Sequence, residues 1–311
     1  MKDIKVIFMG TPEFSVPVLE ELIKKTNVIM VVTQPDKEVG RHKELEYSPI
    51  KKIALENNIE VYQPVKIRKE FDKVVSAGAD IIITCAYGQI IPNEILNAPR
   101  LGCINVHASL LPKLRGGAPL HHAIMDGEEK TGITIMYMDK NMDTGDIIST
   151  KEYTILDSDN VGTLHDKLSV MGRDLLMETL PSIIDGTNKR IKQNNDEATF
   201  AWNITREDEH INFNVSAREV FNKVRGLNPW PKAYMLLNNQ EVKVIECFIG
   251  DKESSFSPGT IIEINKDNIG ISTKDKNIYI TRVKPFGKKE MSALDYINGL
   301  DIEKVLHSIA E

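Results

Sequence analysis

Two side chains suited to polarising a carbonyl group lie two residues apart near the middle of this 311-residue chain. Residues 103–109 read CINVHAS, an apolar run that ends in polar side chains. Side chains alternate faces along a strand, so Asn105, His107 and Ser109 share one face. An asparagine amide and a protonated imidazole both donate hydrogen bonds, which suits them to stabilise a developing oxyanion. A structural role for the pair is the alternative that the spacing leaves open.

A carboxylate suited to the same chemistry follows in residues 140–148, KNMDTGDII. Asp143 stands directly before Thr144-Gly145, a turn signal, so it lies in a loop. If this loop sits at the carboxyl end of the sheet, beside His107, its carboxylate stabilises the charged imidazole. A turn-initiating aspartate with a local hydrogen bond is the alternative. Together, Asn105, His107 and Asp143 resemble an acyl-transfer site that works without a covalent intermediate.

Signatures of other common chemistries are missing from the sequence. Ser109 follows His107 too closely for an ordinary triad and lacks a G-x-S-x-G elbow. His121 and His122 are adjacent, so they point apart, and no H-E-x-x-H motif occurs. The first turn, MGTPEF, contains neither G-x-G-x-x-G nor GK[ST]. We therefore expect no metal and no nicotinamide cofactor.

The first part of the chain provides the scaffold for these residues. Strand-like runs and helical patterns alternate, with strands expected at 4–10, 27–33, 59–64, 79–88, 102–109 and 131–139, and helices near 15–25, 48–58, 67–77 and 159–184. Near-continuous β-branched runs separated by helices predict a Rossmann-like, mostly parallel sheet with helices on both faces. In such a sheet, ligands bind at the carboxyl ends of the strands.

The second part has a different pattern. Residues 187–205 are polar and poorly periodic, which is typical of a linker. A helix around 217–225 is followed by several short strand-like runs with turn residues between them, which predicts a small barrel or sandwich. We therefore expect a catalytic domain over 1–186, a linker over 187–205 and a smaller β domain over 206–311.

Charge and cysteine content limit the partners and the compartment. The net charge of −6 falls on residues 1–186, while the second part is neutral and contains one basic cluster: Lys274, Lys276, Arg282, Lys284, Lys288 and Lys289. Such a cluster holds a polyanion or is an ordinary solvated face, and both readings stay open. Three scattered cysteines predict reduced thiols in a cytoplasmic protein. No apolar run is long enough for a membrane span, and no signal peptide is expected at the N-terminus.

Two segments together resemble a known family. INVHASLLPKLRGGAP and TGITIMYMDKNMDTGDII resemble the formyl-transfer site of the folate-dependent formyltransferases. Four further segments are similar to the methionyl-tRNA formyltransferases within that family: FMGTPEFSVPVLEEL, VVTQPDKEVGR, VRGLNPWPKAY and GKKEMSALDYINGL. The resemblance extends from the first strand to the last helix, and it implies an OB-like β-barrel for the C-terminal domain.

The resemblance also implies an activity and a set of site residues. The activity is transfer of the formyl group of 10-formyltetrahydrofolate to the α-amino group of methionine on initiator methionyl-tRNA, by a cytoplasmic monomer. Asn105 and His107 would bind the formyl carbonyl, and Asp143 would pair with His107. The folate contacts implied are Tyr87, Gln89, Ile90, Ser109, Leu110, Leu111, Pro112 and Asp139. The tRNA contacts expected are Arg41, by the resemblance, and Lys284, Lys288 and Lys289 of the basic cluster.

Two rival functions remain. A formyltransferase acting on a small amine would share the first domain but would not need the second. A folate- or RNA-binding protein without catalysis would bind these ligands and never transfer a formyl group. Deletion from about residue 205 separates the first rival from the tRNA hypothesis, because only a tRNA enzyme would lose affinity for its acceptor.

Overall fold

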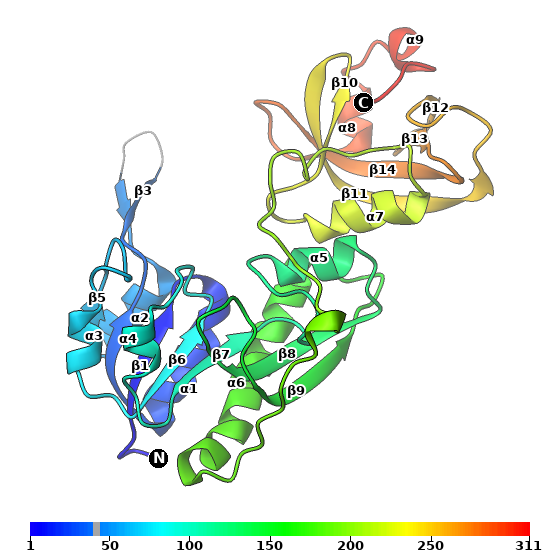
Figure 1. Cartoon of the computed structure of the whole chain (residues 1–311). Coiled ribbons are helices and arrows are strands. Elements are labelled where there is room, and N and C mark those ends of the chain that lie inside the picture. The colour runs from blue at the N-terminus through cyan, green and yellow to red at the C-terminus, as the bar shows by residue number, and fades with distance from the viewer. Residues whose placement is uncertain (40–43) are drawn as a thin grey trace. The chain divides into compact units, whose positions relative to one another are not determined.

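The computed structural model describes residues 1–39 and 44–311, which form two compact units (Figure 1). Unit 1 comprises Met1–Pro119, Lys130–Thr154 and His165–Trp202, and unit 2 comprises Leu120–Glu129, Ile155–Leu164 and Asn203–Glu311. Arg41, one of the predicted tRNA contacts, lies outside the described residues.

Unit 1 is built on a seven-stranded sheet with the order β5-β2-β1-β6-β7-β8-β9. Its strands are β1 Lys5–Gly10, β2 Asn27–Val32, β5 Glu60–Tyr62, β6 Ile81–Cys85, β7 Cys103–His107, β8 Lys130–Tyr137 and β9 Ile147–Thr154. Neighbours from β5 through β7 are parallel, whereas β8 runs antiparallel to both β7 and β9. The predicted mostly parallel sheet is confirmed. The same chain contains a short antiparallel hairpin, β3 Lys37–Val39 and β4 Glu44–Glu46.

Helices cover both faces of this sheet (Figure 1). The helices of unit 1 are α1 Val16–Lys25, α2 Pro49–Glu56, α3 Asp72–Ser76, α4 Asn93–Leu96 and most of α6 Val161–Asp185, with the 3-10 turns η1 Glu13–Ser15 and η2 Asn195–Glu197; α5 Pro119–Met125 belongs to unit 2 apart from its first residue. The helix expected at 67–77 is shorter than predicted. The backbone N–H of Lys66 donates to the Glu70 carboxylate at 2.7 Å, which closes a separate turn before α3 begins.

The pleat of β7 sets which side chains can reach a ligand. Val106 faces α6 at Gly172, where an added Cβ would lie only 2.9 Å from Val106 Cγ1, so the glycine permits this close packing. Cys103 faces the opposite way and packs in a core with Ile95 of α4. Because faces alternate, Asn105 and His107 lie on the Cys103 side, as the spacing predicts. Beyond Cys103 the apolar core ends and the polar site begins.

Unit 2 is a curled antiparallel sheet with the order β10-β11-β14-β13-β12, and β15 pairs with β14. Its elements are α7 Ala217–Gly226, β10 Tyr234–Leu237, β11 Gln240–Glu253, β12 Ile261–Ile264, β13 Ile269–Ser272, β14 Lys276–Pro285, β15 Met291–Ser292, α8 Ala293–Ile297 and α9 Ile302–Val305. Bulges between β11 and β14 bend the sheet. The last residues join its edges, because Glu311 N–H donates to Leu236 of β10 and Ala310 N–H to Gly259 beside β12. This is the OB-like architecture expected for the second part.

Two further observations concern the chain as a whole. Within residues 1–39 and 44–311, no helix combines the length and apolar character needed to cross a membrane. Cys85, Cys103 and Cys247 are free thiols, and the first two are buried.

Candidate functional site

His107 ends β7 and has oxygen atoms near both ring nitrogens. Its side chain is only 6% exposed. Nε2 lies 3.1 Å from the carbonyl oxygen of Leu114, and Nδ1 lies 3.7 Å from Oδ1 of Asp143. A carbonyl oxygen only accepts hydrogen bonds, so Nε2 carries a proton in this arrangement. Loop 108–118 therefore folds back over the strand end and holds the imidazole.

Asp143 reaches His107 from a loop and is held by a backbone group. Its Oδ2 accepts a hydrogen bond from the N–H of Gly116 at 2.8 Å, while Oδ1 faces the imidazole. The Asp143 backbone has φ 54°, in the left-handed region that residues with a Cβ seldom adopt. The predicted pairing of Asp143 with His107 is thus a close approach, longer than a hydrogen bond.

The route of the Asp143 loop differs from the one expected. Because β8 is antiparallel to β7, its last residue, Tyr137, pairs with Ile104 near the amino end of β7. The loop over 138–146 therefore starts nearer the amino end of β7, but Asp143 itself lies beside His107 at the carboxyl end, as expected from the sequence. The loop folds back across the sheet, where Met138 Sδ lies 3.1 Å from Thr84 Oγ1.

Asn105 is oriented by a residue that the sequence did not single out. Thr84 of β6 pairs with Asn105 in the ladder and is 3% exposed. Its hydroxyl donates to Oδ1 of Asn105 at 2.8 Å. With the amide oxygen held in this way, the Nδ2 hydrogens remain as donors for a ligand. A polar residue inside the otherwise apolar run IIITC was the available signal.

The predicted folate loop is tied down by hydroxyl groups. Ser109 is fully buried, and its Oγ donates to the carbonyl oxygen of Lys113 at 2.7 Å. Thr134 of β8 donates from Oγ1 to the Ser109 carbonyl at 2.6 Å and accepts from the Leu111 N–H at 3.1 Å. The peptide between Leu111 and Pro112 is cis. Folate contact by Ser109, Leu110, Leu111 and Pro112 stays a prediction.

The second predicted folate wall presents backbone and amide groups. The Tyr87 side chain is 4% exposed and packs in the core, and its carbonyl accepts from Gln34 Nε2 at 3.0 Å. Gln89 Nε2 donates to Gln34 Oε1 at 3.2 Å, and Ile90 is 58% exposed. Asp139 accepts a hydrogen bond from the Thr144 hydroxyl within the Asp143 loop. Their folate contacts also stay predictions.

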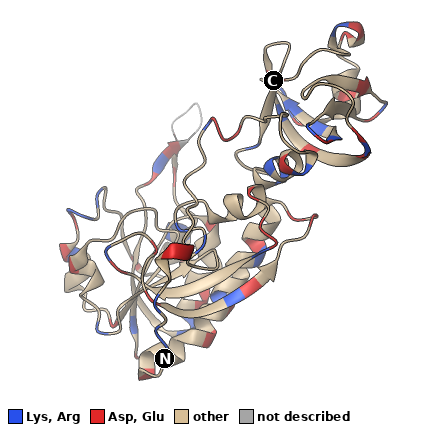
Figure 2. Cartoon of the chain, turned by 45° about the vertical axis from the view of Figure 1, so that its right-hand side comes forward, with Lys and Arg blue, Asp and Glu red and all other residues tan. Residues whose placement is uncertain are grey.

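Charges in unit 2 are mixed, as Figure 2 shows by the alternation of blue and red. Lys284, Lys288 and Lys289 are exposed. Arg282 is partly neutralised, because its guanidinium lies 3.8 Å from a Glu246 oxygen and 3.9 Å from a Glu290 oxygen. Arg282 therefore offers less net positive charge than the exposed lysines of the cluster.

A metal site does not emerge from the described part of the chain. No group of three or more His, Cys, Asp or Glu side chains is arranged there to hold an ion.

Comparison with known proteins identifies the family to which the chain belongs. Residues 2–180 match the formyl transferase family, and residues 203–301 match the formyl transferase C-terminal domain. A methionyl-tRNA formyltransferase from Staphylococcus epidermidis is 54% identical over 299 residues, covering 95% of this chain and 96% of that protein. One from Staphylococcus aureus is 51% identical over 298 residues, with the same coverage.

Solved structures share the fold at lower identity. The sugar 3N-formyl transferase WlaRD, solved with dTDP and 5-N-formyl-THF, has a TM-score of 0.70 at 22% identity and covers 93% of this chain and 100% of its own. HypX from Aquifex aeolicus, solved with tetrahydrofolic acid, has a TM-score of 0.63 at 17% identity, covering 97% of this chain and 48% of its own. On the family match and the identity to its relatives, the chain belongs to the formyl transferase family, within its methionyl-tRNA formyltransferase branch.

Proposed function

We propose that this chain transfers the formyl group of 10-formyltetrahydrofolate to the α-amino group of methionine on initiator methionyl-tRNA, for translation initiation. The observation that carries the proposal is the convergence of Asn105, His107 and Asp143 at one end of β7. Family membership supplies the reaction class, and the 54% identical relative is named for this acceptor.

Asn105 and His107 stabilise the tetrahedral intermediate in this proposal. The free amine attacks the formyl carbon, a C–N bond forms, and the carbonyl oxygen becomes an oxyanion. The Nδ2 hydrogens of Asn105 donate to it, since Oδ1 is held by Thr84. The Nε2–H of His107 donates as well, with the oxyanion replacing the Leu114 carbonyl as its acceptor. Loss of one such donor costs about 2.7–4 kcal/mol in other enzymes.

Asp143 assists the proton movements that complete the transfer. The attacking nitrogen must lose a proton, and the leaving nitrogen of tetrahydrofolate must gain one. The Asp143 carboxylate lies 3.7 Å from His107 Nδ1, so it can stabilise the charged imidazole while a proton moves. Catalytic contacts of this kind are often long without ligands and shorten when substrates bind.

Unit 2 supplies the tRNA-binding surface in the proposal. Lys284, Lys288 and Lys289 lie exposed near the end of β14 and offer charge to the phosphate backbone. Arg41 approaches the acceptor end by similarity. The catalytic domain extends over 1–186 and the tRNA-binding domain over 206–311, with 187–205 between them. The protein acts as a cytoplasmic monomer.

An acceptor assay tests the function directly. Formyl transfer from 10-formyltetrahydrofolate is measured with initiator methionyl-tRNA and, as the control acceptor, free methionine. We expect transfer to the tRNA-linked methionine only. Efficient transfer to free methionine would favour a small-amine enzyme, and folate or tRNA binding without any transfer would favour a non-catalytic binding protein.

Variants test the residue assignments. His107→Ala, Asn105→Ala and Asp143→Ala should each lower turnover by orders of magnitude while circular dichroism shows an intact fold. A His107→Ala enzyme with near-normal turnover would overturn the role of His107.

A further inference from the structure

Part of the polar segment 187–205, expected to be a linker, packs against loop 108–118, which follows His107. Backbone N–H groups make four of the hydrogen bonds between them: Leu114 N–H donates to Thr199 Oγ1 at 2.9 Å, Arg115 N–H to the Thr199 carbonyl at 2.9 Å, Ala201 N–H to the Arg115 carbonyl at 2.7 Å, and Ala118 N–H to the Ala201 carbonyl at 3.1 Å. This is strand-like pairing, and all of these residues belong to unit 1. The segment therefore forms part of the structure around the site.

Gly116 shows how closely the two segments meet. Its φ is 123°, and a Cβ added there would lie 2.5 Å from the Ala201 carbonyl oxygen. The N–H of the same glycine holds the Asp143 carboxylate. Docking of the segment and placement of the carboxylate thus depend on one backbone position.

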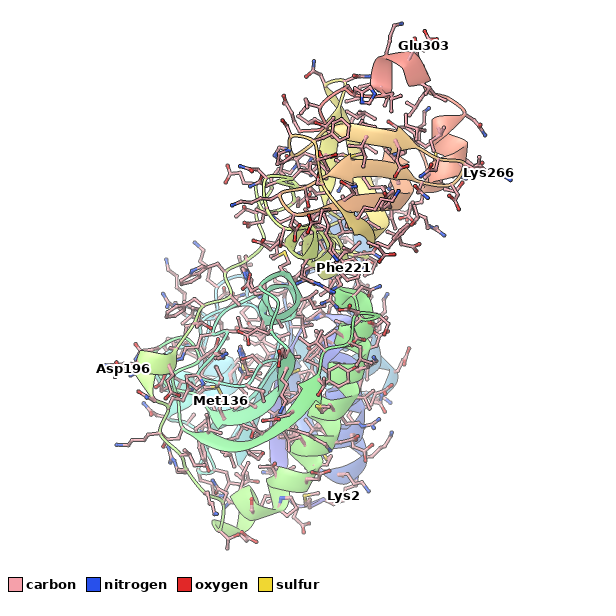
Figure 3. The ribbon with its side chains drawn as sticks, turned by 90° about the vertical axis from the view of Figure 1, so that its right-hand side faces the viewer. Lys2, Met136, Asp196, Phe221, Lys266 and Glu303 are labelled. Carbon is pink, nitrogen blue, oxygen red and sulfur yellow. The ribbon has the colours of Figure 1, made fainter. Side chains whose placement is uncertain are left out.

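A buried arginine lies under this contact. Arg115 is 3% exposed, and its guanidinium donates to two side-chain amide oxygens. Nε and Nη2 bond to Gln193 Oε1 at 3.1 and 2.7 Å, and Nη2 also bonds to Asn195 Oδ1 at 2.9 Å. Figure 3 marks this segment by Asp196, with Met136 of β8 nearer the middle of unit 1. Arg115 therefore fixes the oxygen end of the Gln193 amide.

The nitrogen end of that amide holds the turn that carries Asp143. Gln193 Nε2 donates to the carbonyl oxygens of Asp143 and Gly145, each at 2.8 Å. Strand pairing does not hold this turn, and Asp143 adopts an unfavourable left-handed backbone. Both amide hydrogens of one side chain thus restrain the backbone on either side of Thr144.

We propose that Gln193 is a positioning residue for formyl transfer, which holds the Asp143–Gly145 turn so that the carboxylate meets His107. This inference rests on the proposed role of Asp143. Gln193 contacts no reacting group, and it acts only through the turn. Displacement of a reacting group by about 1 Å can cost about 10²-fold in rate.

Gln193→Glu tests the proposal because it separates the two ends of the amide. Glutamate still accepts hydrogen bonds from Arg115 but cannot donate to the two carbonyl oxygens. We expect kcat to fall about 10²-fold, with the KM for tRNA little changed. Asn195→Ala is the matched control, since Asn195 also bonds Arg115 but, among the residues that the structure describes, makes no hydrogen bond to the turn. It should retain nearly the full kcat.

A double-mutant cycle measures whether the effects of Gln193→Glu and Asp143→Asn on kcat are coupled, which a merely structural role of Gln193 would not produce. On an Asp143→Asn background, Gln193→Glu should cost little further kcat, because both changes disable one group. The inference is overturned if Gln193→Glu lowers kcat by the same factor in the wild type and in Asp143→Asn. It is also overturned if Gln193→Glu has a normal kcat, or if Asn195→Ala loses as much kcat as Gln193→Glu. Normal kcat in Asp143→Asn overturns the proposed role of Asp143 and the inference with it. Gln193→Met, which cannot donate either but also removes the acceptor for Arg115, replaces Gln193→Glu if that variant unfolds at the assay temperature.

Discussion

Thr84→Val tests whether Asn105 acts as an oriented donor. The Thr84 hydroxyl is buried and donates to Asn105 Oδ1 at 2.8 Å, which leaves Nδ2 as the end of the amide available to a ligand. Valine keeps the branched, strand-favouring shape of threonine and removes only the donor. Without the hydroxyl, the Asn105 side chain is still present, but no donor fixes its Oδ1, so the amide can turn and present oxygen instead of nitrogen to the ligand.

General hydrogen-bond energies set a lower and an upper limit on the loss of kcat in Thr84→Val. A hydrogen bond between neutral groups contributes about 0.5–1.5 kcal/mol net, and a buried group left without a partner costs about 1–3 kcal/mol. Complete loss of an oxyanion donor costs about 10²–10³ in kcat. We expect Thr84→Val to lie between these limits, with kcat lowered about 5–30-fold, equivalent to about 1–2 kcal/mol.

Initial rates at saturating 10-formyltetrahydrofolate and methionyl-tRNA measure kcat, and thermal unfolding followed by circular dichroism measures stability. Thr84→Ser is the matched control, because it keeps the hydroxyl and loses a buried methyl group. Its stability should fall by about 0.5–1.5 kcal/mol, with kcat nearly unchanged. A loss of kcat in Thr84→Val but not in Thr84→Ser would then be due to the missing hydroxyl and not to lower stability. Normal kcat in Thr84→Val, or a slower Thr84→Ser, would refute the reasoning.

Three further predictions follow from single features. Gly116→Ala places a Cβ 2.5 Å from the Ala201 carbonyl oxygen, so both kcat and the melting temperature should fall; a normal kcat would contradict this. The double change Lys288→Ala and Lys289→Ala should raise the KM for tRNA and reduce the slope of log affinity against log salt by about one per lysine. Lys266→Ala, on the turn between β12 and β13 (Figure 3), should leave that slope unchanged. The same slope in the double variant and in Lys266→Ala would contradict tRNA contact by Lys288 and Lys289. Burial raises the pKa of the Cys85 and Cys103 thiols to about 12. The folded protein favours the neutral thiols, so the free energy of unfolding is unaffected by their ionisation below the ordinary thiol pKa. It decreases as the pH rises from that value toward 12. At pH 8, mass spectrometry should find these thiols unalkylated by iodoacetamide in the native protein and fully alkylated after unfolding.

The sequence predicted the scaffold well because buried parallel strands leave a strong local signal. The runs at 27–33 and 102–109 match β2 and β7 closely, and the long helix expected at 159–184 is α6. Alternation along β7 was enough to place Asn105 and His107 on one face. These predictions depend only on hydrophobic period and on neighbouring residues, which a single sequence displays.

The remaining features depend on contacts between distant segments. The apolar pattern of β8 is the same for either strand direction, so it did not reveal that the Asp143 loop starts at the far end of the sheet. Thr84 stands out only as a polar residue in an apolar run, and its pairing with Asn105 is needed to reveal its role. Gln193 lies 50 residues from Asp143 in a segment without periodicity. Local pattern contains no information about such partners.

The site therefore combines two kinds of support that respond differently to substitution. Asn105 and His107 are strand residues, and the ladders on both sides of β7 fix their backbones. Asp143 is a loop residue, and two of its polar groups are held by other segments: Oδ2 by Gly116 N–H and the carbonyl oxygen by Gln193. A strand ladder shares strain among many hydrogen bonds, whereas a loop held by a few contacts moves when one is lost. Activity should thus be more sensitive to changes in 114–118 and 193–201 than their distance in sequence from Asp143 suggests.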